Sequence, residues 1–278
     1  MRHQTWWPAI LVAVVAGLVP APALAKSITM SVSPTVEVQD GNLIAHVKLS
    51  NSGDDVAQSV TPVLRFRGKE ARGETKPALG PNQSVEATVS VPSGELTGGR
   101  WPYRLAVDYT DANQYPFQAV HVGLFSVGET PGPKLAVPSV TADPLAGSGT
   151  VRVTVKNLAG AARHVTLAPA LPEAIEATKP TQEVDVDRWG ESVVAFPVVN
   201  RTALAGSRFP VFITAEYDED GVHQAVVGVG TLEVIAAQSR LLAGKTVLWV
   251  VAGVLVVGWL GFLLARTMGR PRGAAPRA

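Results

Sequence analysis

The chain has 278 residues, of which 46% are hydrophobic and 17% charged, and its 24 Lys and Arg nearly balance its 23 Asp and Glu. It contains no cysteine, which excludes a disulfide framework, a thiol nucleophile and thiolate metal sites. Domains of about 100 residues can bury enough core without such cross-links.

The N-terminal segment has the pattern of a secretory signal. Arg2 precedes the apolar run Ala9 to Val19, which is shorter than the ~20 residues that a membrane span needs. The small residues Ala23 and Ala25 follow at the spacing that a signal peptidase accepts. We expect residues 1–25 to be a signal peptide that is cleaved before Lys26, and the alternative is an uncleaved anchor.

Residues 26–128 have the alternating pattern of a β-sandwich. In the stretch H-V-K-L-S-N-S-G from His46, the apolar Val47 and Leu49 alternate with polar residues before an asparagine and a glycine end the run. Short turn sequences such as Asp40-Gly41 separate the runs, which favours antiparallel strands over βαβ units. Strands are expected near 27–38, 43–50, 58–67, 84–91, 102–109 and 116–127.

Residues 135–236 repeat this pattern after a linker, 129–134, that contains two prolines. The stretch R-V-T-V-K-N-L-A-G from Arg152 matches the one from His46, and R-F-P-V-F-I-T-A-E-Y-D from Arg208 matches R-W-P-Y-R-L-A-V-D-Y-T from Arg100. The pairs lie 106 to 108 residues apart, the size of one sandwich. Strands are expected near 134–142, 150–157, 163–170, 191–199, 209–217 and 223–235, and the short linker is expected to hold the two sandwiches in a semi-rigid rod.

The C-terminal part has the pattern of a membrane anchor. Residues 246–265 are twenty residues without a charge or a proline, which predicts a transmembrane helix rather than a buried soluble helix. The tail 266–278 carries four arginines and no acid, so the positive-inside rule places it in the cytoplasm. The prediction is a single-pass protein of the cell membrane with its N-terminal domains extracytoplasmic and its C-terminus cytoplasmic.

The expected outer part is mildly acidic. All 23 Asp and Glu but only 17 of the 24 Lys and Arg lie between Lys26 and Ser239, which gives a net charge of −6. This balance gives no support to binding of nucleic acid.

The repeated pattern V-x-V-x-V-x-N-x-x-G, followed by G-x-x-P-Y-x-L-x-V-x-Y-x-D, resembles the immunoglobulin-like modules of bacterial surface proteins, of the cell-adhesion-related bacterial domain type. The resemblance covers essentially all of 26–236. It implies an all-β chain of two tandem immunoglobulin-like β-sandwiches plus one C-terminal transmembrane α-helix, and a function in adhesion, spacing or binding. It transfers no functional residue.

The acidic stretch Glu216–Asp220 is the densest group of carboxylates in the chain. Asp220-Gly221 is the pair that a tight hairpin prefers, so we expect a turn, with His223 as a solvated strand residue beyond it. A calcium site, the alternative, needs six to eight oxygens from a loop that wraps the ion. We expect no metal site and no cofactor.

A possible anionic-ligand face is formed by Arg65, Arg67 and Lys69, which alternate along a predicted strand and its exit. An ordinary solvated strand face, partly neutralised by Glu70 and Glu74, is the alternative reading. No serine elbow, zinc-binding helix motif or phosphate loop occurs, so no catalytic residue is expected and the chain is not predicted to be an enzyme.

Two functions fit this organisation. The first is a non-enzymatic, membrane-anchored binding or scaffold protein of the bacterial cell envelope, with an envelope protein or a surface glycan as its partner. The second is a carbohydrate-binding accessory subunit of a system for synthesis, export or degradation of a cell-surface polysaccharide. We favour the first, because Trp101 and Trp189 are both expected in the core rather than on a glycan-binding face.

Overall fold

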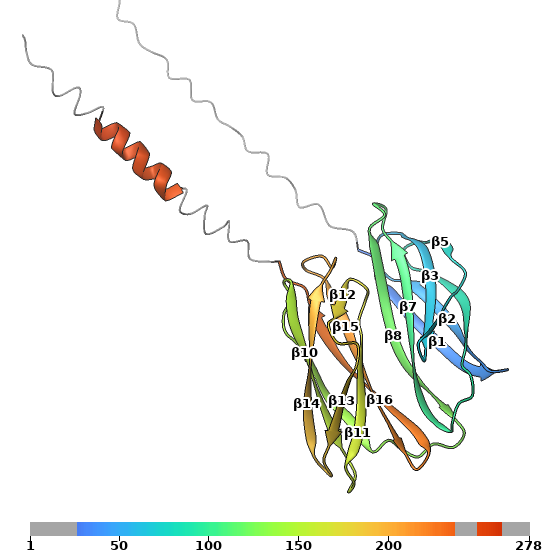
Figure 1. Ribbon diagram of the computed structural model, residues 1–278. Coiled ribbons are helices and arrows are strands. Elements are labelled where there is room, and N and C mark those ends of the chain that lie inside the picture. Colours follow the sequence, from blue (N-terminus) through green and yellow to red (C-terminus); the bar gives the residue numbers. More distant parts are fainter. Residues whose placement is uncertain (1–26, 237–248, 263–278) are drawn as a thin grey trace, which may run out of the picture.

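The computed structural model of the chain describes residues 27–236 and 249–262 (Figure 1). The expected signal peptide 1–25 and tail 266–278 lie outside these residues. The described protein is mostly β, as expected, with strands β1 to β16 followed by one short helix.

The first sandwich consists of two antiparallel layers. One sheet has the order β1-β2-β6, and the facing sheet joins β3, β7 and β8, with β4 and β5 beside β3. This is the strand order of an immunoglobulin-like sandwich, in which the first, second and sixth strands face the third, seventh and eighth. The strands are Met30–Gln39, Asn42–Asn51, Ala57–Phe66, Lys69–Arg72, Lys76–Leu79, Gln83–Pro92, Gly99–Thr110 and Pro116–Val127.

The second sandwich repeats this arrangement. Its sheets are β12-β14-β10-β9 and β13-β11-β15-β16. The strands β9 to β16 are Leu135–Ala142, Ser148–Asn157, Arg163–Ala170, Ile175–Ala177, Gln182–Val186, Glu191–Asn200, Arg208–Glu219 and Val222–Glu233.

Period-two alternation explains both cores. On β2 the side chains of Leu43, Ala45, Val47 and Leu49 are at most 2% exposed, while the polar residues between them face solvent. On β10 the residues Val151, Val153 and Val155 are all 0% exposed. Two separate clusters of buried residues result, one within residues 28–127 and the other within 135–234.

An asparagine at the end of the second strand of each sandwich is buried in the same way. Asn51 is 1% exposed and donates from Nδ2 to the carbonyls of Asp55 and Leu79 at 2.7 and 3.1 Å. Asn157 is 0% exposed and donates to the carbonyls of Ala161 and Val186 at 2.7 and 3.2 Å. The repeated asparagine therefore stabilises the end of the strand, because its side-chain amide donates to carbonyls that would otherwise be buried without a hydrogen-bond donor.

Every strand expected from the sequence overlaps an observed strand, and four short strands were missed. These are β4, β5, β12 and β13, of three to five residues each, which lie at sheet edges or pair with one strand. A run this short shows too few alternations for its period to be recognised.

The two sandwiches lie side by side, so the semi-rigid rod expected from the linker is wrong (Figure 1). Between them Val120 and Val122 of β8 pack with Ala170, with Phe212 and Val227 against the same cluster. The outer face of the first sandwich thus carries apolar residues that only the second sandwich covers. The linker permits this packing by turning the chain back between Val127 and Leu135.

The expected transmembrane segment 246–265 is described over 249–262 only, and those residues are helical. Among the described residues, no helix combines the length and the apolarity required to cross a bilayer.

Candidate functional site at the seam between the sandwiches

The three basic residues predicted to share a face do not do so. The chain reverses after Phe66 through Arg67 and Gly68, which have φ of 47° and 75°, and Phe66 then pairs with Lys69. Arg65 pairs with Glu70, so Arg65 and Lys69 lie on opposite faces of the β3–β4 hairpin. The expectation failed because it treated a two-residue turn as a continuing strand.

Arg65 and Arg67 make contacts inside the protein. Arg65 bonds Glu70 at 2.6 Å and reaches across the seam to Glu173 of the second sandwich at 3.2 Å. The Arg67 guanidinium lies 5.2 Å from the centroid of the Trp101 ring and donates to the Glu95 carbonyl. Lys69 is exposed at the start of β4. Whether any of the three binds an anion stays a prediction.

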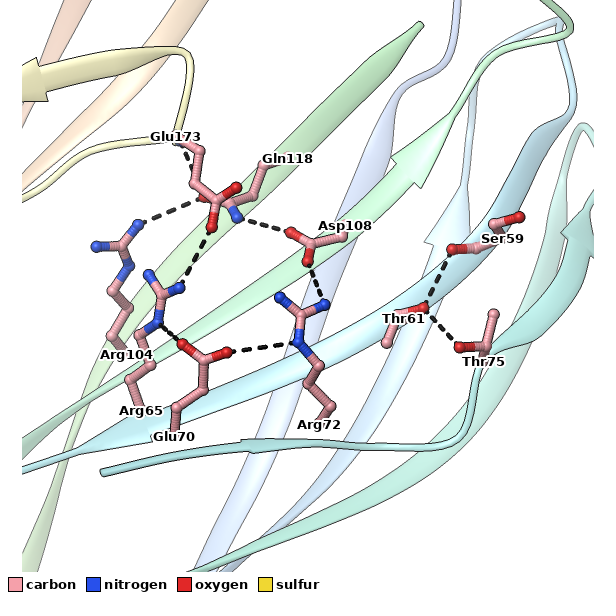
Figure 2. Close-up of polar contacts among 10 residues, drawn as sticks. All are labelled: Ser59, Thr61, Arg65, Glu70, Arg72, Thr75, Arg104, Asp108, Gln118 and Glu173. Carbon is pink, nitrogen blue, oxygen red and sulfur yellow. Dashed lines mark hydrogen bonds and ion pairs between the residues drawn. The ribbon is translucent and has the colours of Figure 1, made fainter. Parts of the chain in front are cut away.

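Arg65 belongs to a polar network of three guanidiniums and three carboxylates, shown in Figure 2. The Arg72 guanidinium lies 3.4 Å from the Glu70 carboxylate and 3.1 Å from the Asp108 carboxylate. Asp108 also accepts a hydrogen bond of 2.6 Å from the Gln118 amide. Gln118 in turn accepts from the backbone N–H of Glu173 at 3.2 Å. Because positive and negative groups alternate, the network is close to neutral, and it ties β3, β4, β7 and β8 to the loop before β12.

Arg104, the third guanidinium, lies at the centre of the seam. Burial and, to a smaller extent, repulsion from Arg65 lower its pKa to about 10, against the attraction of Glu173 and Asp108. It donates to the Leu171 carbonyl of the second sandwich, and its Nε is buried without a partner among the described residues. A buried guanidinium with an unmet donor is tolerated here because the neighbouring carboxylates compensate its charge.

The acidic stretch forms the expected hairpin turn. β15 and β16 are joined by Asp220 and Gly221, with φ of 52° and 77°, which is the left-handed pair of a two-residue hairpin. Glu219 contacts Lys134 at 3.1 Å and Arg163 at 2.6 Å, although the Arg163 side chain is only 6% exposed. No cluster of metal-ligating side chains that could hold an ion occurs within 27–236 or 249–262.

His223 is not the solvated residue that the sequence predicted. Its ring stacks on Trp101 of the first sandwich, with centroids 3.8 Å apart and planes 16° from parallel. Nδ1 lies 2.9 Å from Asp218 and Nε2 lies 3.2 Å from Glu216. Burial lowers the pKa of His223, but the hydrogen bonds and the charges of these two carboxylates raise it above its ordinary value. The imidazolium form, which donates from both nitrogens, fits this position.

Gly99 brings the backbones of the two sandwiches together. It forms a parallel bridge with His223, and the His223 N–H donates to the Gly98 carbonyl at 3.1 Å. A Cβ at Gly99, whose φ is 144°, would lie 2.1 Å from the His223 carbonyl oxygen. Only glycine permits this approach.

A cleft of about 410 Å³ opens at the other end of the seam. Its walls contain aromatic rings from both sandwiches: Tyr109, Tyr115 and Phe117 from the first and Phe209 from the second. The Tyr115 hydroxyl donates to the Thr202 carbonyl across the seam. Sequence reasoning missed this cleft, although the aromatic residues of Y-T-D-A-N-Q-Y-P-F, from Tyr109, were a signal.

Trp189 was expected in the core but is 66% exposed. It has φ of 57° and lies in the turn between β13 and β14, so its side chain is not part of the alternation of a strand. Trp101, by contrast, is 9% exposed, as predicted.

No protein-family model and no curated protein matches the chain. Among solved structures, a red sea bream transglutaminase is 11% identical over 76% of this chain and 31% of its own, with a TM-score of 0.27. An Escherichia coli α2-macroglobulin activated by porcine elastase is 10% identical over 76% of this chain and 22% of its own, with a TM-score of 0.31. The periplasmic chaperone SfaE is 11% identical over 75% of this chain and 100% of its own, with a TM-score of 0.30.

The chain thus spans less than a third of the transglutaminase and macroglobulin chains that it resembles. TM-scores near 0.3 support no argument about function. The immunoglobulin-like assignment rests on the strand order of the two sandwiches.

Proposed function

We propose that the chain is a non-enzymatic, membrane-anchored binding or scaffold protein that holds its two sandwiches outside the cytoplasm in the bacterial cell envelope. The observation that carries the proposal is the apolar surface of helix 249–262, where Trp249 is 76%, Val257 69% and Phe262 64% exposed. Apolar surface of this extent belongs against lipid or another protein. The surrounding run 246–265, without a charge or a proline, favours lipid.

The seam supports a binding function for the outer part. Two sandwiches joined by a flexible linker would act as a spacer, whereas these are linked by side-chain and backbone contacts around Gly99, Arg104 and His223. Such contacts fix the loops of one sandwich relative to those of the other. A surface assembled from both sandwiches can then be presented to a partner in one geometry.

Fractionation of the full chain, produced with a C-terminal tag in a bacterial host, tests the anchor. We expect the chain to stay in membranes after an alkaline carbonate wash, and protease added to spheroplasts to digest residues 26–236. Val256→Arg should reduce membrane insertion by about 2.5–3.5 kcal/mol, whereas the matched Val256→Ala should not. Release of the unchanged chain by carbonate, or protection of the sandwiches from protease, would contradict the proposal.

A carbohydrate-binding accessory subunit of a surface-polysaccharide system is the second candidate. The exposure of Trp189 and the aromatic walls of the cleft favour it, since saccharide rings pack on exposed aromatic faces. Both candidates share the anchor, so they differ in what the cleft binds.

A further inference from the structure

We propose that the cleft between the sandwiches binds a short neutral saccharide. The proposal rests on the binding function proposed above and names the class of ligand.

The shape of the cleft suits a small ligand rather than a flat protein surface. Its volume of about 410 Å³ lies within the range of roughly 300–1,000 Å³ that is typical of ligand pockets. Tyr109 stacks on Phe117 with centroids 5.7 Å apart, and Tyr115 lies 5.1 Å from Phe117. Phe209 of the second sandwich also lines the cleft, so the apolar walls come from both sandwiches. The C–H face of a sugar ring packs well against such rings.

The charge of the cleft favours an uncharged ligand. Among residues 27–236 and 249–262, no Lys, Arg or His lines the cleft, whereas Asp108 and Glu173 do. Each of these carboxylates already contacts a guanidinium, Asp108 that of Arg72 at 3.1 Å and Glu173 that of Arg65 at 3.2 Å. The lining is therefore close to neutral but rich in acceptors, which matches the hydroxyl donors of an uncharged sugar.

Thr110 supplies the unsatisfied polar group. It lines the cleft, and its hydroxyl oxygen is buried without a hydrogen-bond partner among the described residues. Such an atom is unusual in a folded protein, and rotation of the Thr110 side chain toward the cleft would give its hydroxyl a partner on a bound ligand. Tyr109 also lines the cleft, and burial raises the pKa of its phenol to about 12.

The backbone beside the cleft is distorted in a way that is common at binding sites. Ser59, a lining residue on β3, has φ of 52°, and the pairing of β3 with β7 shifts register between Gln58 and Thr61. Figure 2 shows Thr61 bonded to the Ser59 carbonyl and to the Thr75 hydroxyl, at 3.2 and 2.8 Å, which holds this bulge in place. A strained residue and a bulge in one strand are features that concentrate at ligand sites.

Saturation-transfer NMR on the full chain in detergent micelles tests the proposal. The probes are the neutral trisaccharides maltotriose, cellotriose, mannotriose and triacetylchitotriose, with anionic trigalacturonate and the cationic glucosamine trimer for comparison. Each is used up to about 10 mM, which detects dissociation constants in the millimolar range. We expect transfer to at least one neutral trisaccharide and none to the charged ones.

Two variants test whether the saccharide binds in the cleft. Thr110→Val removes the unpaired hydroxyl while keeping the shape, and Phe117→Leu removes one aromatic face. We expect Thr110→Val to weaken binding about tenfold, because the saccharide loses its hydrogen bond. Thr154→Val on β10, outside the cleft, is the matched control and should bind as the unchanged chain does. If Phe117→Leu does not fold, Thr110→Val alone decides.

The proposal is overturned if no neutral trisaccharide binds, if only a charged probe binds, or if Thr110→Val binds as tightly as Thr154→Val. Cleavage of a bound trisaccharide would support the cleft as a saccharide site and overturn the non-enzymatic function. Release of the chain from membranes would overturn the anchor and leave the binding result intact.

Discussion

The stack of Trp101 on His223 joins the two sandwiches, and a double-mutant cycle measures the coupling free energy between these two residues. The variants are Trp101→Leu, His223→Gln and the two together, in the full chain. Stacked aromatic pairs contribute about 0.5–1.5 kcal/mol beyond their buried area, and a desolvated cation over a ring contributes about 2 kcal/mol. With ring centroids 3.8 Å apart, we expect a coupling free energy of about 1–2 kcal/mol when His223 is protonated.

The coupling should depend on pH with a defined sign. Glu216 and Asp218 face His223 from the neighbouring strand β15, and Trp101 faces it from β7. The Arg67 guanidinium lies 5.2 Å from the centroid of the Trp101 ring. Because the pKa of His223 is raised in the folded state, its contribution is fully present below the unfolded pKa of about 6.5 and is lost as pH rises through the folded pKa. The coupling should therefore be larger at about pH 5.5 than at about pH 9.

Urea unfolding followed by far-UV circular dichroism, in micelles at both pH values, gives the four free energies of unfolding. Trp101→Leu combined with Val193→Ala, which is exposed on β14, is the control cycle and should be additive within about 0.5 kcal/mol. Additivity of the Trp101 and His223 variants at both pH values would refute the role of the stack in joining the sandwiches.

Further substitutions test the other contacts. Asn157→Ala should lower the free energy of unfolding by about 2–4 kcal/mol, because buried carbonyls lose their donor. The partly exposed Asn42→Ala is the control and should change it by less than about 0.5 kcal/mol. Equal effects of the two variants in urea unfolding would argue against this role of Asn157. Glu219→Gln should lower the free energy of unfolding by about 1.5–3 kcal/mol, because the buried Arg163 loses a charged acceptor. Asp220→Asn in the same turn is the control, and coinciding thermal melts of the two variants would count against this ion pair. Arg104→Met should cost about 1–3 kcal/mol through the unmet Leu171 carbonyl, and an unchanged melt would show that water replaces the guanidinium.

The fold followed from the sequence because its signals are local. Alternation such as Val47 and Leu49, and turn pairs such as Asp220-Gly221, are each decided by a few neighbouring residues. Because the pattern recurs after 106 to 108 residues, each strand or turn signal in the first sandwich is supported by a matching signal in the second. Where the signal was too short or broken by a turn, as at Arg67-Gly68, the prediction extended a strand past its end.

The seam could not be predicted, because each of its contacts joins residues far apart in the chain. Trp101 was correctly expected to be buried, but nothing near it indicates His223 as the residue that covers it. The pairing of Arg65 with Glu173 likewise joins residues 108 positions apart. Nothing in the sequence around Gly99 indicates its close approach to His223, because that contact depends on how two finished sandwiches pack.

A distance measured between the two sandwiches shows whether they are held in one fixed arrangement. The chain has no cysteine, so Ser90→Cys and Val193→Cys, both exposed, can carry a pair of spin labels for electron–electron double resonance. We expect one narrow distance distribution, which Gly99→Ala broadens because its Cβ would meet the His223 carbonyl oxygen, while Gly98→Ala, with its nearest contact at 3.6 Å, leaves it unchanged. A broad distribution in the unchanged chain would show that the two sandwiches move relative to each other, and the same narrow distribution in Gly99→Ala would show that the Gly99 contact does not fix them.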